Sequence, residues 1–144
     1  MIKSQIIKLD VKNIDDVYEI LHEAFNDEAW NMEQLLSSFN NSSNAYYGMV
    51  LNGKIVSIIS LLITVDDINI LDIATKNDYK NKGHATRLID YVKSIKNEAQ
   101  TISLEVKESN DIAINFYKKQ GFYPVCKRKK YYRTGEDAII MFYN

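Results

Sequence analysis

Residues 73–87 read Ile73-Ala74-Thr75-Lys76-Asn77-Asp78-Tyr79-Lys80-Asn81-Lys82-Gly83-His84-Ala85-Thr86-Arg87, and the rest of the sequence is best understood from them. Before this stretch, closely spaced and mostly β-branched apolar residues predict a buried strand: Ile68, Ile70, Leu71 and Ile73. Towards its end and beyond, apolar residues recur at helical spacing and predict an amphipathic helix: Leu88, Ile89, Val92 and Ile95. The stretch is therefore a polar connection from a strand to a helix.

This connection has the features of an anion site. It is rich in lysine and asparagine, and Gly83 stands just before the expected helix. The first turn of a helix presents backbone N–H groups that lack partners, and the helix dipole adds partial positive charge there. Gly83 would let the backbone approach an anion closely or take a positive φ. The same residues would also suit an ordinary, solvated connection.

Length and composition indicate one ordinary domain over residues 1–144. The chain is 26% charged and 46% hydrophobic, which suits a soluble globular protein with a single core. A net charge of −1 argues against a dedicated nucleic-acid-binding protein, because contacts to phosphates need a basic excess. The single cysteine, Cys126, excludes an internal disulfide, and we expect its side chain to be buried.

The sequence gives no sign of export, of a membrane or of a metal. The start, Met1-Ile2-Lys3-Ser4, does not open a signal peptide, and no stretch approaches the roughly 18 apolar residues that a membrane span needs. The two histidines, His22 and His84, are too few and too far apart to indicate a metal centre. We therefore expect a soluble, cytoplasmic protein with no metal and no membrane partner.

Periodicity and turn signals predict the remaining elements. We expect strands at residues 2–9, 45–51, 54–65, 101–106, 123–132 and 137–143, and helices that end near residues 25, 39 and 120. Local signals mark helix and hairpin ends: Asn13 or Asp15, Asn31, Asn52-Gly53, Gly121 and Thr134-Gly135. Connections that run through helices imply parallel pairing of the strands that flank them. The fold class is α/β, a mixed sheet with helices on both faces.

Three stretches carry a resemblance to a known family. Lys80-Asn81-Lys82-Gly83-His84-Ala85 matches an Arg/Gln-x-x-Gly-x-Gly/Ala pyrophosphate loop, with Lys80 and His84 as departures. A strand, an Asn-x-x-Ala helix and a Tyr before Gly-Phe are matched by Leu104-Glu105-Val106, Ser109-Asn110-Asp111-Ile112-Ala113-Ile114-Asn115-Phe116-Tyr117 and Gly121-Phe122. Residues 128–141, with Tyr131-Tyr132 and Glu136-Asp137-Ala138-Ile139-Ile140-Met141, match the C-terminal segment of one branch of the same family. The chain resembles the GCN5-related N-acetyltransferases (the GNAT family) along its whole length, and within them the RimI type.

The resemblance implies a single-domain GNAT fold with a mixed, mostly antiparallel sheet, and acetyl-CoA as co-substrate. RimI-type enzymes acetylate the N-terminal alanine of a small-subunit ribosomal protein. The implied partner is therefore the N-terminal peptide of such a protein, acetylated by direct attack in a ternary complex. Ala29-Trp30-Asn31 stands where that branch often has Pro-Trp-Ser, which weakens the match on the acceptor side. Two alternatives stay open: acetylation of a small-molecule amine or a lysine, and a non-catalytic acyl-CoA-binding module.

Two side chains are candidates for the chemistry, since acyl transfer to an amine needs a base for the amine and a proton for the departing thiolate. Glu105 lies between Leu104 and Val106, which should face the core, so its carboxylate should face the other way. That position suits either a base or a solvated strand face. Tyr117 suits either a proton donor or a core aromatic. In both cases the resemblance favours the catalytic role.

The resemblance also implies which residues bind the substrates. Backbone groups of Ile73, Ala74 and Thr75 would pair with the pantetheine arm of acetyl-CoA as a missing strand would. Further contacts to acetyl-CoA are implied for Lys80, Asn81, Lys82, Gly83, His84, Ala85, Thr86 and Asn110. Trp30 and Tyr131 would line the acceptor site. The basic run at residues 127–133 could contact nucleic acid or discourage aggregation of a solvated strand, and we favour the second.

Overall fold

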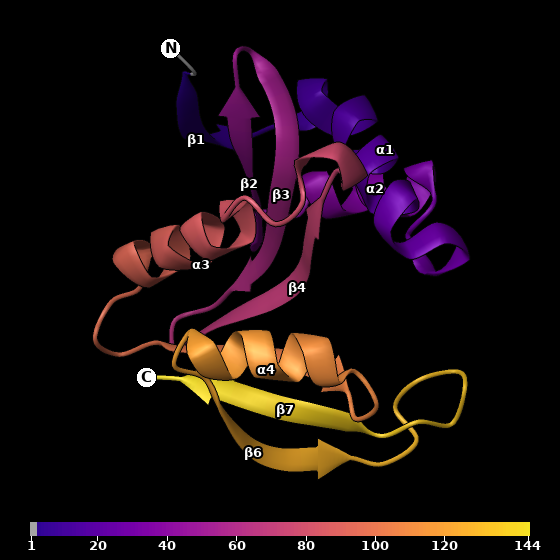
Figure 1. Cartoon of the computed structure of the whole chain (residues 1–144), viewed down its shortest axis with the longest axis vertical. Helices are drawn as coiled ribbons and strands as arrows, with labels where there is room; N and C mark the ends of the chain where they lie inside the picture. The colour runs from indigo at the N-terminus through magenta and orange to yellow at the C-terminus, as the bar shows by residue number, and fades with distance from the viewer. Residues whose placement is uncertain (1–2) are drawn as a thin grey trace.

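The computed structural model describes residues 3–144, which form one seven-stranded sheet (Figure 1). In chain order its strands are β1 (Ser4–Leu9), β2 (Asn44–Leu51), β3 (Lys54–Ile63), β4 (Asp67–Thr75), β5 (Thr101–Lys107), β6 (Tyr123–Arg128) and β7 (Ala138–Tyr143). They lie side by side in the order β1-β2-β3-β4-β5-β7-β6. Among the described strands, β4 and β5 form the one parallel pair. The expected mixed, mostly antiparallel α/β sheet is confirmed.

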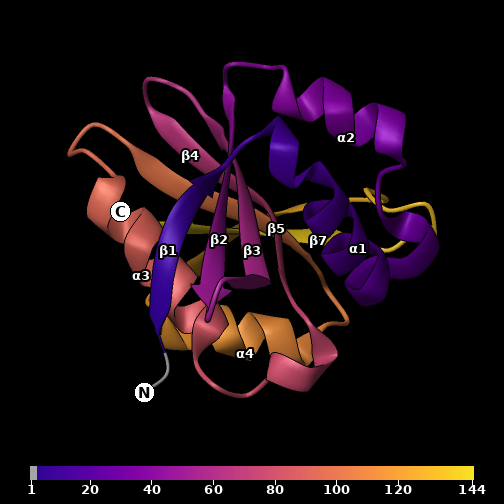
Figure 2. The same cartoon turned by 90° about the horizontal axis from the view of Figure 1, so that it is seen from above.

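Helices cover both faces of this sheet (Figure 2). One face carries α1 (Ile14–Phe25) and α2 (Met32–Phe39), and the other carries α3 (His84–Ile95) and α4 (Asp111–Lys119). Short 3-10 turns precede or follow them: η1 (Val11–Asn13), η2 (Asn26–Glu28) and η3 (Asn77–Tyr79). The Asn31 side chain caps α2 by accepting from the Gln34 N–H at 2.8 Å, which confirms the expected cap.

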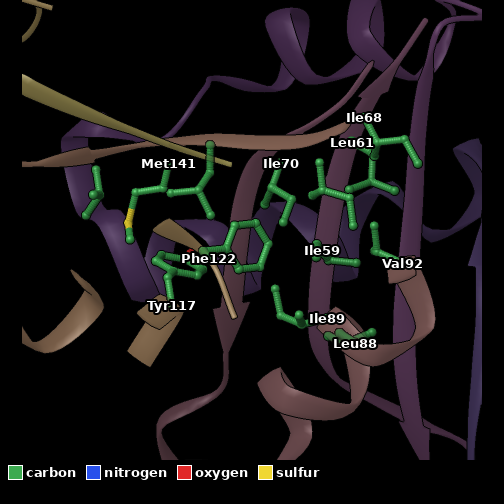
Figure 3. Close-up of a cluster of buried hydrophobic side chains, with 13 residues drawn as sticks. Ile59, Leu61, Ile68, Ile70, Leu88, Ile89, Val92, Tyr117, Phe122 and Met141 are labelled. Atoms are coloured by element: carbon green, nitrogen blue, oxygen red, sulfur yellow. The ribbon is translucent and has the colours of Figure 1, made fainter. Parts of the chain in front are cut away.

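Each face of the sheet has its own apolar core. Figure 3 shows the core beneath α3 and α4, where side chains of the sheet meet helical ones: Ile59, Leu61, Ile68, Ile70, Leu88, Ile89, Val92, Tyr117, Phe122 and Met141. The core beneath α1 and α2 includes Val17, Ile20, Leu21, Leu35, Tyr46, Ile55, Ile58 and Ala74. Full burial of a large apolar side chain contributes about 1.5–3 kcal/mol of stability. These contributions hold the helices to the sheet.

The arrangement of the last two strands differs from the expectation. Strands flanking a helix should pair in parallel, and this is right for β4 and β5 but wrong for β5 and β6, because β7 lies between them. The sequence of β7 is continuously apolar and none of its residues is exposed, as suits a strand between two others, whereas every residue of β6 is exposed. Pro124 and Lys127 suit that edge position. Cys126 lies on β6 and is exposed, so its expected burial is wrong.

Some element ends also differ. The strand expected at residues 2–9 begins at Ser4, and Ile2 lies outside the described residues. The strand expected to reach residue 132 ends at Arg128. The chain turns there because Lys130 adopts a φ of 53° and donates its backbone N–H to the Asp137 carboxylate at 3.0 Å. Other expected ends lie within about two residues of the observed ones.

The sheet opens between β4 and β5. Their pairing runs from Asp67↔Thr101 to Ile70↔Leu104 and then stops, although β4 continues to Thr75 and β5 to Lys107. A β-bulge at Leu71 lies just past the last pair, because Ser60 pairs with Asp72 while Leu61 pairs with Ile70. Because the two strands separate, the sheet divides into two parts. Figure 1 shows β1 to β4 in the upper part of the molecule and β6 and β7 in the lower part.

Candidate active site

A cavity of about 840 Å³ lies where β4 and β5 separate. Its walls come from β4 and β5, from the loop before α3 and the start of that helix, from α4, and from the end of α1 with the segment that follows it. Residues expected from the sequence to bind substrates or act in catalysis line it: Trp30, Ile73, Ala74, Thr75, Lys80, Asn81, Gly83, His84, Ala85, Thr86, Glu105, Asn110 and Tyr117. Lys82 and Tyr131 do not line it.

One end of the cavity is formed by the first turn of α3. Gly83 precedes the helix with a φ of 83°, in the left-handed region that favours glycine, and a Cβ there would meet no atom within 4 Å. No side chain caps this helix, so the backbone N–H groups of its first turn have no partner within the helix. These donors, with Lys80 beside them, face the cavity as an anion site would require.

Asn110 lies at the start of α4, where the chain leaves β5. Its side-chain oxygen accepts from the Ala113 N–H at 3.1 Å, so it acts as an ordinary helix cap. The residue also lines the cavity. The cap leaves its side-chain amide N–H groups free to face a ligand, because the described residues offer them no hydrogen-bond partner.

Glu105 lies on β5 just past the last pair with β4. Leu104 and Val106 are buried beneath α3 and α4, so Glu105 faces the α1 and α2 side, as its alternation predicts. Its carboxylate is half-buried and lies 3.9 Å from the guanidinium of Arg128. Hydrogen bonding to this carboxylate raises the pKa of Tyr131, and the Arg128 guanidinium lies 4.3 Å from the centre of the Tyr131 ring. Tyr131 thus touches the candidate base from outside the cavity.

Tyr117 is both a core residue and a cavity residue. Its ring packs edge-on against Phe116 and Phe122, with centroids 5.3 and 5.7 Å away, and the side chain is only 8% exposed. Its hydroxyl forms no hydrogen bond within residues 3–144. Burial raises the pKa of Tyr117 to about 12, with a smaller contribution from Asp72. The phenol therefore keeps its proton at neutral pH and offers the cavity an O–H donor.

Comparison with known proteins identifies the family. The sequence model of the acetyltransferase (GNAT) family matches residues 14–122. The chain belongs to this family. It is 31% identical to a Bacillus subtilis (strain 168) protein assigned as a [ribosomal protein bS18]-alanine N-acetyltransferase, over 97% of this chain and 95% of that protein.

Solved structures agree. The ribosomal-protein-S18-alanine N-acetyltransferase of Escherichia coli superposes with a TM-score of 0.83 at 27% identity, covering 97% of this chain and 92% of that one. Ard1 from Thermoplasma volcanium superposes with a TM-score of 0.85 at 25% identity, covering 97% and 96%. The chain is therefore a GNAT enzyme, an acetyl-CoA-dependent N-acyltransferase, as the sequence resemblance implied.

The cavity of this GNAT enzyme fits acetyl-CoA. A diphosphate group needs donors and positive charge, which the uncapped start of α3 supplies. An extended pantetheine arm with two amides needs a strand whose outer edge has no partner, which β4 supplies beyond Ile70. No cluster of His, Cys, Asp and Glu in the described chain could hold a metal ion, and no helix there is long and apolar enough to cross a membrane.

Among the residues of this GNAT cavity that the sequence did not predict, four carry a strongly shifted pKa or form an ion pair. Asp72 on β4 has its pKa raised to about 6 by burial, and a charged residue within an apolar strand was the signal that could have found it. Burial raises the pKa of Tyr132 to about 12. Lys107 and Glu28 form an ion pair at 3.3 Å that joins β5 to the turn after α1. The pairing of segments 79 residues apart carries no local sequence signal.

His84 is the first residue of α3, and only 7% of its side chain is exposed. Neither of its ring nitrogens has a hydrogen-bond partner in the described part of the chain. Burial, with Arg87 and Lys82 nearby, lowers the pKa of His84, so its ring is neutral at neutral pH. An aliphatic residue is usual at this position of the loop in the family, and the buried ring takes that place in this GNAT enzyme.

Proposed function

We propose that this GNAT enzyme transfers the acetyl group of acetyl-CoA to the α-amine at the N-terminus of a protein, in particular the N-terminal alanine of a small-subunit ribosomal protein. The observation that carries the proposal is that one cavity holds the uncapped start of α3, Glu105 and Tyr117. The acceptor is supported by relatives named for alanine N-acetylation that match over almost the whole chain.

The proposed binding roles are supported by the geometry of the cavity. Backbone groups of Ile73, Ala74 and Thr75 hold the pantetheine arm along the free edge of β4. The loop and the first turn of α3 hold the diphosphate through backbone N–H groups: Asn81, Gly83, His84, Ala85 and Thr86. Lys80 and Lys82 add positive charge from the loop, and Asn110 adds a contact from α4. Acetyl-CoA supplies an activated acyl group on a thioester.

The chemical roles fall to Glu105 and Tyr117. The acceptor nitrogen attacks the thioester carbonyl carbon, the carbon–sulfur bond breaks, and the amine proton passes to Glu105 directly or through water. The Tyr117 hydroxyl donates a hydrogen bond to the departing sulfur. With a pKa of about 12, the phenol is a weaker acid than an ordinary thiol near 8.5, so it acts as a hydrogen-bond donor that stabilises the thiolate. Direct transfer is supported by the position of Cys126, which does not line the cavity.

The acid–base properties of amines favour an α-amine as acceptor. An α-amine has a pKa near 8 and a lysine side chain about 10.4, so at neutral pH the α-amine is neutral roughly two hundred times more often. One half-buried carboxylate is then a sufficient base. Trp30, which lines the cavity after α1, and Tyr131, which touches Glu105, form part of the acceptor side.

Acetyl transfer to defined acceptors tests the proposal. The purified protein is incubated with acetyl-CoA and peptides that begin Ala-Arg, and free thiol release and the mass of one added acetyl group are measured. Matched peptides with a blocked N-terminus and an internal lysine, a polyamine and an aminoglycoside serve as alternative acceptors. We expect turnover of the free Ala-Arg peptide above all others. Turnover of a small amine with none of any peptide would overturn the proposal.

A further inference from the structure

Asp72 is a carboxylate of the cavity that the proposed chemistry does not use. In the strand register, Asp72 on β4 lies directly opposite Ser60 on β3, and Ser60 lies directly opposite Tyr46 on β2. Tyr46 belongs to the core beneath α1 and α2, and side chains directly opposite each other on neighbouring strands share a face. The Asp72 side chain therefore faces the α1 and α2 side of the sheet.

This is the same side that Glu105 faces, across the opening between the strands. The last β4–β5 pair is Ile70↔Leu104, so Asp72 lies two residues beyond it on β4 and Glu105 one residue beyond it on β5. The bulge at Leu71 is what brings Asp72 to this face. The segment from α1 to α2 closes the same part of the cavity with Phe25 and Trp30, so both carboxylates border the acceptor side.

Asp72 has no cation of its own. Of the carboxylates lining the cavity, Glu28 pairs with Lys107 and Glu105 with Arg128, whereas Asp72 forms no ion pair within residues 3–144. The titratable groups that interact with it are Tyr46 and Tyr117, and burial raises the pKa of both, so they are neutral. An unpaired carboxylate in such a site is costly unless a cation completes it.

We propose that Asp72 binds the protonated α-amine of the acceptor and positions its nitrogen beside Glu105, an inference that rests on the proposed function. The acceptor arrives mostly as a cation, because an α-amine has a pKa near 8. The negative charge of Asp72 attracts and orients that cation, and Glu105 then accepts its proton. Asp72 is thus a specificity-determining residue for acceptors with a free amine.

Binding of two matched peptides tests the inference. One peptide begins Ala-Arg, and in the other a hydroxyl replaces the α-amine, so that it is neutral but of the same shape. Calorimetry at about pH 7.5 in the presence of CoA, which cannot transfer an acetyl group, measures both affinities. We expect the wild type to prefer the amine by about tenfold or more, the range of a charge-assisted hydrogen bond, and Asp72→Asn to lose that preference.

A matched control is Asp67→Asn, at the start of the same strand, where the carboxylate accepts from Ser103 at 2.9 Å and does not line the cavity. It should keep the wild-type preference. Both variants should bind acetyl-CoA as the wild type does, and both should fold, which thermal melting checks. An Asp72→Asn protein that unfolds cooperatively and still prefers the amine would overturn the inference.

The acetyl transfer assay separates this inference from the proposed function. If the wild type acetylates the Ala-Arg peptide while Asp72→Asn keeps the amine preference, only the role of Asp72 fails. If the wild type neither binds nor acetylates any peptide, the proposed function fails and the inference fails with it.

Discussion

At the scale of single residues, the Glu105 carboxylate interacts with two neighbours, the Arg128 guanidinium and the Tyr131 hydroxyl. We expect Glu105→Gln to lower kcat about a hundredfold near pH 7, the usual contribution of a general base, because most of the amine is then protonated. The deficit should shrink towards pH 9, where the amine is neutral without help. Steady-state kinetics with an Ala-Arg peptide from pH 6.5 to 9 measures both effects. A pH profile parallel to that of the wild type would exclude Glu105 as the base.

Tyr117 offers a cleaner substitution, because its ring packs in the core while its hydroxyl has no hydrogen-bond partner among the described residues. We expect Tyr117→Phe to lower kcat about tenfold or more, since the departing thiolate loses a donor. The melting temperature should stay close to that of the wild type, because no internal hydrogen bond is lost. A normal kcat in the folded variant would show that Tyr117 is only a core aromatic.

His84 places a polar ring where its nitrogens find no partner. An unsatisfied buried polar group costs about 1–3 kcal/mol, so His84→Leu should raise the free energy of unfolding. The pKa of His84 is lowered in the folded protein, so the unfolded chain binds more protons, and the wild type loses stability as the pH falls below about 6.5. The advantage of the variant should therefore be larger at pH 5.5 than at pH 8. Urea unfolding at both pH values checks this, and an advantage that grows with pH would contradict it.

At the scale of secondary-structure elements, the two helices on the acetyl-CoA side are each bounded by a glycine in the left-handed region. Gly121 ends α4, and a Cβ there would lie 3.3 Å from the Tyr143 ring, whereas one at Gly83 would meet no atom. Both alanine variants carry the backbone cost of about 1–2 kcal/mol. We expect Gly121→Ala to lose more stability in urea, and Gly83→Ala to lose more acetyl-CoA affinity in calorimetry. Equal losses of stability would mean that the Tyr143 ring moves aside.

Most helices and strands were predictable because each has a local cause, such as the Asn31 cap or the Asn52-Gly53 turn, whose φ values are 49° and 82°. The place of β7 was not, because strand order depends on pairing between segments that are distant in the sequence, which no local pattern marks. The opening between β4 and β5 was implied only by the family resemblance, since the bulge at Leu71 leaves no distinct sequence pattern.

The site divides in the same way. Residues that follow one another in the loop before α3 were found together, although Lys82 does not line the cavity. Asp72, Glu28 and Lys107 were missed, because each reaches the cavity through a bulge or through contact between distant segments. Sequence motifs therefore described the acetyl-CoA side well and the acceptor side poorly.

For the molecule as a whole, Asp72 sets part of the dependence of stability on pH. Its pKa is about 6 in the folded protein and 3.8 ordinarily, so folding disfavours the charged form. The contribution of this group to stability is greatest below about pH 4, falls as the pH rises through 6, and is constant above that. The total loss of stability is about 3 kcal/mol. Asp72→Asn should escape that loss, so its stability advantage should appear between pH 4 and 6 and persist above. Chemical unfolding across that range measures it, and a variant less stable than the wild type at pH 8 would contradict it.

The position of β7 has a consequence for how a newly made chain becomes active. Synthesis delivers β5 and β6 before the strand that separates them. Until residues 138–143 emerge, β4 is the one described strand that β5 pairs with, over four residues, and the far edge of β5 is open. Contacts between distant segments also form slowly. The wall that carries Glu105 is therefore completed last, so a nascent chain can build β1 to β4 and the loop before α3 well before it can catalyse a reaction.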